Sequence, residues 1–265
     1  MSTARVAIVT GGAQGIGEAI ALRLADDGVD VVVSDIPGKE EQLATVVKQI
    51  ELKGRRSLFV TANVSVEADI KGLVDKTVEA FGGLDIMIAN AGITLFKPFL
   101  DTTPEDWDKM FATNTTGVML SYKYAALQMI KQGRGGRIIG IFAMSAYSAS
   151  KFAVRGLTQA VGETQFDSEV EPLFMVGNIA QELRPHKITV NCYAPGFILT
   201  PMLAHPDDDK FGGLGSVAKM AAKMPDDLEG AKPSVVAELV AYFTKPEAYF
   251  VTGQTINVDG GLMFD

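Results

Sequence analysis

Short, mostly apolar runs rich in valine and isoleucine recur along the chain, and stretches with helical spacing separate them. Such runs predict strands that are buried on both faces, as in a parallel sheet. The stretches between them, such as Ile16–Asp27, Glu40–Lys53 and Ile70–Phe81, predict helices on both faces of that sheet. The predicted strands are Val6–Val9, Val31–Ser34, Ser57–Val60, Asp85–Ala89, Arg137–Phe142, Thr189–Cys192 and Thr255–Val258. The sequence therefore predicts an α/β fold, with residues 1–265 forming a single doubly wound domain on a seven-stranded parallel sheet.

Composition and charge narrow the class of protein. Hydrophobic residues make up 47% of the 265 residues, enough to bury a sizeable core, and the net charge is −8. An acidic chain without a basic run repels phosphate backbones, so we expect no nucleic-acid partner. No apolar stretch approaches the ~20 residues of a membrane span, and the N-terminus leads directly into the first predicted strand, without room for a signal peptide. The single cysteine, Cys192, fits a reducing compartment, so we expect a cytoplasmic protein.

A glycine-rich segment, Thr10–Gly17, joins the first predicted strand to the first predicted helix. A tight turn from strand to helix needs residues with positive φ, and a pyrophosphate must approach the backbone where no Cβ intrudes. Gly11, Gly15 and Gly17 meet both needs, and the helix N-terminus supplies N–H donors. The segment predicts the dinucleotide site of a Rossmann-type domain, and an ordinary glycine-rich loop is the alternative.

Asp35 ends the second predicted strand, about 20 residues after the glycine turn, where a carboxylate can accept hydrogen bonds from the adenosine ribose hydroxyls. A carboxylate there also repels a 2′-phosphate. No basic residue follows immediately, since the nearest is Lys39. The sequence therefore predicts NAD(H) in preference to NADP(H), and a solvated loop aspartate is the alternative.

Further motifs follow the later predicted strands: Asn90-Ala91-Gly92, Asn114, Tyr147 to Lys151, Pro195-Gly196, Thr252–Gln254 and Asp259–Gly261. Together with the glycine turn, they resemble the short-chain dehydrogenase/reductase family over nearly the whole chain. Within that family, Lys151–Thr158 and Ile188–Asn191 are most similar to acetoin (diacetyl) reductases and butanediol dehydrogenases.

The resemblance implies roles for three catalytic residues. Tyr147 would be the general acid/base that gives or takes the hydroxyl proton of the substrate. Lys151, one helical turn later, would lower the pKa of Tyr147 and bind the nicotinamide ribose. Asn114 would kink a long helix locally and hold a water that feeds a proton relay through Lys151. A surface helix pair is the alternative for the tyrosine and the lysine.

The resemblance also implies a set of cofactor contacts. Asn63 and Val64 match a pair that contacts adenine; the family usually has aspartate first, and asparagine keeps the acceptor oxygen. The segment from Pro195 to Thr200 matches one that clasps the nicotinamide carboxamide and the pyrophosphate. The full set is Gly11, Gln14, Gly15, Ile16, Gly17, Asp35, Asn63, Val64, Asn90, Ala91, Gly92, Tyr147, Lys151, Pro195, Gly196, Ile198 and Thr200. His186 and His205 lie far apart without a ligand cluster, so we predict no metal site.

The chain departs from the family after the fifth predicted strand. The family has a serine pair there, then about a dozen residues, then the tyrosine, whereas Tyr147 follows Ala143 by only four residues. The loop with the serine that orients the substrate is therefore predicted to be deleted. Ser145 is expected to cap the helix that holds Tyr147, and the alternative is that it replaces the missing serine.

Two further segments interrupt the pattern. Residues 161–178 form a predicted insertion, where Pro172 should break the helix after Tyr147. In the family this helix forms much of a dimer contact, so the resemblance implies a homodimer or homotetramer, and the insertion is expected to disturb that contact. Residues 201–230 predict a substrate loop or lid, in which Asp207–Asp209 should be solvated. The methionines of this segment, Met202, Met220 and Met224, are expected to serve in packing, and the alternative is that they line an apolar substrate pocket.

The leading functional prediction is an NAD(H)-dependent oxidoreductase that interconverts a secondary alcohol and a ketone. Its substrate would be a small or medium hydroxy or keto compound, such as acetoin or diacetyl. Loss of the serine loop predicts impaired turnover. Two alternatives stay open: a non-catalytic dinucleotide-binding protein, and a non-redox cyclase or isomerase.

Overall fold

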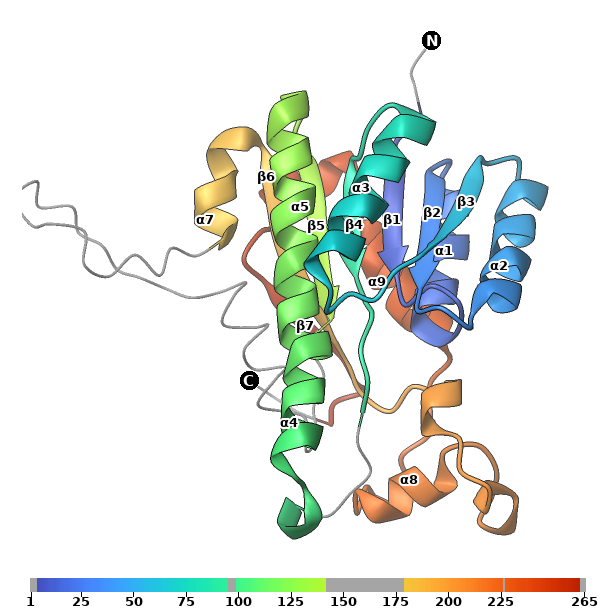
Figure 1. The fold of residues 1–265 in the computed structure, drawn as a ribbon. Helices are drawn as coiled ribbons and strands as arrows, with labels where there is room; N and C mark the ends of the chain where they lie inside the picture. The colour runs from blue at the N-terminus through green and yellow to red at the C-terminus, as the bar shows by residue number, and fades with distance from the viewer. Residues whose placement is uncertain (1–3, 95–98, 142–178, 226, 263–265) are drawn as a thin grey trace, which may run out of the picture.

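The computed structural model describes residues 4–94, 99–141, 179–225 and 227–262 (Figure 1). Within them, seven strands form one parallel sheet in the order β3-β2-β1-β4-β5-β6-β7. The strands are β1 Val6–Thr10, β2 Asp30–Asp35, β3 Ser57–Thr61, β4 Ile86–Ala89, β5 Gly136–Ile141, β6 Ile188–Pro195 and β7 Thr255–Val258. The predicted fold class is confirmed, and each predicted strand overlaps an observed one.

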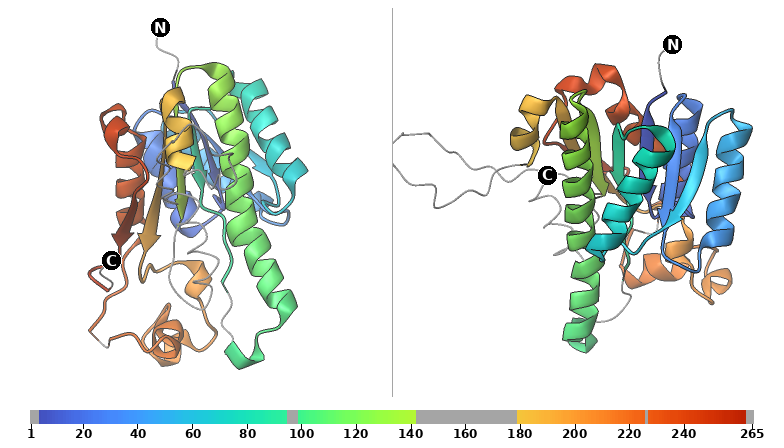
Figure 2. Two further views of the ribbon diagram at one scale, coloured as in Figure 1. Left: turned by 90° about the vertical axis from the view of Figure 1, so that its left-hand side faces the viewer. Right: turned by 45° about the horizontal axis from the view of Figure 1, so that its top comes forward.

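Helices cover both faces of the sheet (Figure 2). One face packs against α1 Gly15–Asp26, α2 Glu40–Leu52 and α9 Pro233–Thr244. The other packs against α3 Glu67–Phe81, α5 Gly117–Gln132 and the short α7 Ile179–Leu183. Each long helix buries residues three or four apart, such as Ile70, Leu73 and Val74 on α3, because this spacing places them on one helical face.

The remaining short elements lie mostly in the connections. α4 Pro104–Phe111, the π-helical turn Ala112–Thr116 and α5 follow one another without a break and form one long rod in Figure 1. The helix α8 Ser216–Ala221 lies beyond the edge of the sheet at which the strands end. The 3₁₀ turns are Phe99–Asp101, Arg184–His186, Pro201–Leu203, Asp208–Lys210 and Pro246–Phe250.

The order in which the chain adds strands to the sheet reverses direction beside β1. The chain moves from β1 outward to β2 and β3, then returns to β4 on the other side of β1. The loops after β1 and β4 therefore leave the sheet in opposite directions and open a crevice at its carboxyl-terminal edge. Ligands of open α/β sheets bind in a crevice of this kind.

Candidate cofactor and active site

A cavity of about 670 Å³ lies at this crevice. It is lined by residues that follow β1, β2, β3 and β4, by the start of α1, and by the segment after β6. Twelve of the predicted cofactor contacts line it: Gly11, Gln14, Gly15, Ile16, Gly17, Asp35, Asn63, Val64, Asn90, Ala91, Gly92 and Thr200. The structure thus brings together residues that are spread over almost 190 positions of the sequence.

The glycine turn lines this cavity with bare backbone, and a side chain would not fit at its glycines. Gly11 and Gly15 adopt φ of +64° and +62°, which favours glycine. A Cβ on Gly17 would lie 2.1 Å from the carbonyl oxygen of Gly11 and 2.7 Å from Nδ2 of Asn90. The bare backbone and the first turn of α1 leave room for a diphosphate against N–H donors. The residues present therefore fit a dinucleotide.

Asp35, the last residue of β2, is fixed on the cavity wall by two backbone groups. Its Oδ2 accepts a hydrogen bond from the Ala13 amide at 3.2 Å, and its Oδ1 accepts one from the Ile36 amide at 2.9 Å. Lys39 lies on the same wall, and its Nζ donates to Oε1 of Gln14 at 3.2 Å. The sequence did not place Lys39 in the site. No residue pattern predicts the turn after β2 that brings Lys39 back towards Gln14.

Asn63 and Val64 lie after β3 and form another part of the wall. Oδ1 of Asn63 accepts hydrogen bonds from the amide and the hydroxyl of Ser65, at 3.1 and 2.8 Å. Val64 packs against the start of α5, where a Cβ on Gly117 would lie 2.6 Å from its Cγ2. The acceptor oxygen that asparagine retains is therefore engaged within its own turn.

Asn90, directly after β4, holds the glycine turn in place through hydrogen bonds. Its Nδ2 donates to the carbonyl oxygens of Thr10 at 2.9 Å and Gly11 at 3.2 Å. The amides of Asn90 and Ala91 both donate to Oγ1 of Thr10 at 3.1 Å. The buried hydroxyl of Tyr193 donates to Oδ1 of Asn90 at 2.9 Å. Burial raises the pKa of Tyr193 well above its usual value, so this hydroxyl stays protonated.

Asn114 is fully buried in the π-helical turn that separates α4 from α5. Its Oδ1 accepts from the Ile93 amide and its Nδ2 donates to the Ile93 carbonyl oxygen, both at 2.9 Å. The expected local distortion of the long helix at this residue is present. Asn114 does not itself line the cavity within the described residues, whereas its neighbours Ile93, Ala112 and Thr113 do.

The segment after β6 contributes less of the lining than expected. Thr200 lines the cavity and packs on the glycine turn, since a Cβ on Gly15 would lie 3.3 Å from its Cβ. The described lining does not include Pro195, Gly196 or Ile198. Ile198 is buried in the core on the α9 side, and a Cβ on Gly196 would lie 2.6 Å from the Cα of Asp259. These residues therefore pack against the rest of the protein and hold the segment after β6 in place.

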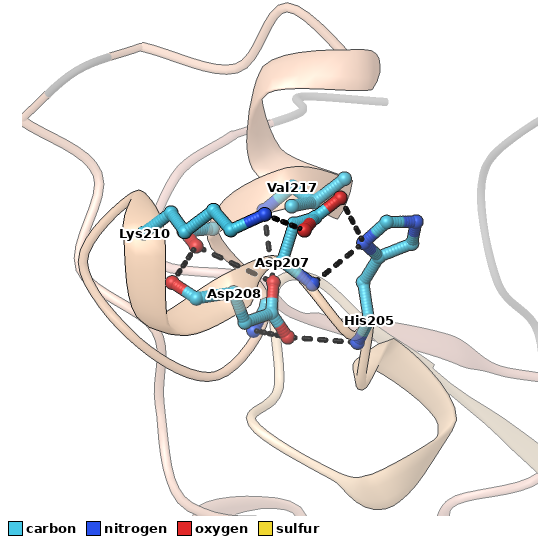
Figure 3. Close-up of polar contacts among 7 residues, drawn as sticks. His205, Asp207, Asp208, Lys210 and Val217 are labelled. Carbon is cyan, nitrogen blue, oxygen red and sulfur yellow. Dashed lines mark hydrogen bonds and ion pairs between the residues drawn. The ribbon is translucent and has the colours of Figure 1, made fainter.

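The predicted lid contains an ordered carboxylate at its centre (Figure 3). Asp208 accepts hydrogen bonds from the amides of His205, Gly215 and Val217 at 2.9 to 3.0 Å. These bonds lower its pKa to about 2. The expectation that Asp207–Asp209 is solvated is wrong for Asp208, which is only 6% exposed, because the loop folds its own amides around that carboxylate.

The expectation for the methionines was also wrong in part. Met202 is 43% exposed and lines the cavity, and Met220 is 51% exposed on α8. Both belong to a segment that lies outside the two packed faces of the sheet, so its apolar side chains have less protein to pack against. Lys109 on α4 and Ile141 at the end of β5 are further lining residues that the sequence did not indicate.

Some of the predicted site lies outside the described residues. These are Tyr147, Lys151 and Ser145, together with the predicted insertion 161–178. Among the residues that are described, no group of three or more histidine, cysteine, aspartate or glutamate side chains could hold a metal ion. Within the same residues, every helix is too short or too polar to span a bilayer.

Family models and relatives agree with this geometry. A family model described as short chain dehydrogenase matches residues 5–171, and one described as enoyl-(acyl carrier protein) reductase matches residues 173–263. A short-chain dehydrogenase/reductase of Armillaria gallica is 43% identical, covering 100% of this chain and 98% of the relative. An L-2,3-butanediol dehydrogenase of Corynebacterium glutamicum is 36% identical, covering 98% of this chain and 99% of the relative.

Solved structures show the same likeness. An acetoin dehydrogenase from Enterobacter cloacae superposes with a TM-score of 0.79 at 32% identity, covering 99% of this chain and 97% of that one. A short chain dehydrogenase from Mycobacterium paratuberculosis bound to NAD has a TM-score of 0.81 at 31% identity, covering 97% of each chain. The chain belongs to the short-chain dehydrogenase/reductase family, and its relatives include butanediol and acetoin dehydrogenases.

Proposed function

We propose that this protein is an NAD(H)-dependent oxidoreductase that interconverts a secondary alcohol and a ketone. The observation that carries the proposal is the cavity built on the glycine turn, with Asp35 on its wall and the Asn114 turn behind it. The butanediol and acetoin dehydrogenases among the relatives support a small hydroxy or keto substrate of the acetoin or diacetyl type.

The chemistry divides between the cofactor and the chain. A bound nicotinamide dinucleotide supplies or accepts the hydride. Tyr147 donates the proton to the carbonyl oxygen in reduction and takes it from the hydroxyl in oxidation. As the family resemblance implies, the ammonium of Lys151 would favour the phenolate and so lower the pKa of Tyr147. Asn114 would assist this proton transfer, as the family resemblance implies. It lies in the π-helical turn, where the amide and the carbonyl oxygen of Ile93 hold its side chain in place.

The preference for NAD(H) rests on Asp35. Its carboxylate is held on the wall by the amides of Ala13 and Ile36, so it stays in place when a ribose arrives. It would accept hydrogen bonds from ribose hydroxyls and repel a 2′-phosphate. Lys39 on the same wall offsets part of that repulsion. We therefore expect NAD(H) to bind more tightly than NADP(H), with a moderate gap.

We propose further that turnover is impaired because the loop with the substrate-orienting serine is missing. That hydroxyl stabilises charge that develops on the carbonyl oxygen. The alignments to two relatives extend over 274 and 275 positions, more than the 265 residues of this chain, so they contain gaps in this chain, as the proposed deletion would produce. Ser145 is expected to act as a helix cap rather than as a replacement.

The family relationship also supports a homodimer or homotetramer. The predicted insertion 161–178 falls in the helix that forms much of the dimer contact in the family. Light scattering coupled to size-exclusion chromatography measures the assembly directly. A monomer at micromolar concentration would contradict the proposed homodimer or homotetramer.

The test of the proposed function is oxidation of NADH, followed by its near-ultraviolet absorbance, with a panel of diketones and hydroxyketones. We expect slow but measurable turnover with at least one of them, and less with NADPH. Binding of NADH without turnover on any carbonyl compound would favour a non-catalytic dinucleotide-binding protein. Conversion of a substrate without change in NADH would favour a cyclase or isomerase.

A further inference from the structure

A buried hydroxyl links two parts of the cofactor cavity wall whose residues lie 103 positions apart in the sequence. Tyr193 lies on β6, and none of its surface is exposed. Its hydroxyl donates to Oδ1 of Asn90 on the far side of β5 at 2.9 Å. Two residues after Tyr193, β6 ends, and the chain continues into the segment with Thr200 that lines the cavity.

This hydrogen bond fixes which way the Asn90 amide faces. An asparagine amide can turn over and exchange its oxygen for its nitrogen. With the Tyr193 hydroxyl donating to Oδ1, the Nδ2 group faces the carbonyl oxygens of Thr10 and Gly11. In the turned orientation, the amide oxygen would meet those two carbonyl oxygens, and acceptors would face acceptors.

The Asn90 amide in turn sets the shape of the glycine turn. A Cβ on Gly11 would lie 2.9 Å from its Nδ2, and one on Gly17 would lie 2.7 Å from it. The amide therefore touches the backbone on both sides of the turn, at the start of α1. A displacement of this amide moves the N–H groups that a diphosphate would bind.

We propose that Tyr193 is a positioning residue of the cofactor site, which holds the glycine turn in its binding shape through Asn90. The proposal rests on the proposed function, because it takes a dinucleotide diphosphate as the ligand of the turn. Without the hydroxyl, Oδ1 of Asn90 loses its donor, so the amide is held only from the side of the glycine turn and the free protein populates other shapes of that turn. The ligand must then restore the binding shape, which weakens binding.

The chain offers a matched control in Tyr122 on α5. This tyrosine is equally buried, at 1% exposure, but it packs on the opposite face of the sheet. Its hydroxyl lies 3.6 Å from Sγ of Cys192. Loss of this hydroxyl also removes a buried polar contact but leaves Asn90 and the glycine turn untouched.

The experiment compares Tyr193→Phe with Tyr122→Phe in the full-length protein. Calorimetric titration gives the dissociation constants of NAD⁺ and ADP, and thermal unfolding without ligand reports stability. For Tyr193→Phe we expect both dissociation constants to rise about tenfold, the size typical of one lost buried hydrogen bond. Tyr122→Phe should stay within about twofold of the unmodified protein. Asn90→Ala should weaken binding too, and adding Tyr193→Phe to it should cause no further loss, because the tyrosine acts through that amide.

Equal dissociation constants for Tyr193→Phe and the unmodified protein would overturn this inference while the proposed function stands. A further loss in the Asn90→Ala background would also overturn it, since Tyr193 would then act by another route. Absence of NAD⁺, NADP⁺ and ADP binding by the unmodified protein would overturn the proposed function and this inference together. Should Tyr193→Phe lose stability, titration at a lower temperature at which it is folded still measures the change in affinity.

Discussion

Substitution of Gly17 by alanine tests whether the glycine turn is shaped by close backbone contact. Alanine is favoured over glycine in a helix by about 0.8–1.0 kcal/mol. At Gly17 the new Cβ would lie 2.1 Å from the Gly11 carbonyl oxygen and 2.7 Å from Nδ2 of Asn90, so the turn must open. Overpacking of this kind costs about 1–3 kcal/mol. We therefore expect Gly17→Ala to be neutral or destabilised by up to about 2 kcal/mol, with NAD⁺ binding strongly weakened.

The matched control is Gly72 on α3, where a Cβ would meet nothing within 4 Å. Gly72→Ala should gain about 0.5–1 kcal/mol and leave NAD⁺ binding unchanged. Urea unfolding measures the free energy of both variants, and calorimetric titration measures their NAD⁺ affinity. If Gly17→Ala is as stable as Gly72→Ala and binds NAD⁺ like the unmodified protein, the proposed role of this contact is refuted.

Three further changes test other parts of the account. Asp35→Ala should narrow the difference between NAD⁺ and NADP⁺ affinity in calorimetric titration, and tighter NADP⁺ binding by the unmodified protein would contradict the assigned preference. Asp208→Asn should destabilise the segment 201–230 and raise KM more than Asp207→Asn does. Because the pKa of Asp208 is lowered from 3.8 to about 2, the stability that this carboxylate contributes is fully present above about pH 4 and is lost as the pH falls through about 2. A serine-pair loop of family length inserted between Ile141 and Phe142 should raise turnover by up to about 10²–10³-fold at unchanged NADH affinity, and no gain would show that another group has replaced the serine.

The sheet could be predicted from the sequence because its strands are buried on both faces and carry a local signal. The Val/Ile runs mark each strand but do not fix the residue at which it ends. The predicted sixth strand stopped at Cys192, whereas β6 runs to Pro195 because Tyr193 to Pro195 pair with β7. That pairing joins residues about 60 positions apart, so no local pattern reveals it. The prediction therefore missed Tyr193.

Some residues of the candidate site could likewise be predicted from a local pattern, and others could not. The glycine turn, Asp35 and Asn90 were predictable, since each lies at or directly after the end of a strand and the strand order carries them to one edge. Lys39 and Lys109 reach the cavity through the path of a turn and of a long helix, which the sequence pattern does not fix. Asp208 looked like one of three solvated aspartates, because the amides that surround it come from the folding of its own loop.

The most direct test of the central claim is turnover of Tyr147→Phe with NADH and a diketone that the unmodified protein reduces. The substitution removes the proton donor and little contact area, so turnover should be abolished while NADH affinity stays nearly intact. Calorimetric titration of NADH on the same preparation establishes that the cofactor site is unchanged. Undiminished turnover in Tyr147→Phe would contradict the proposed mechanism.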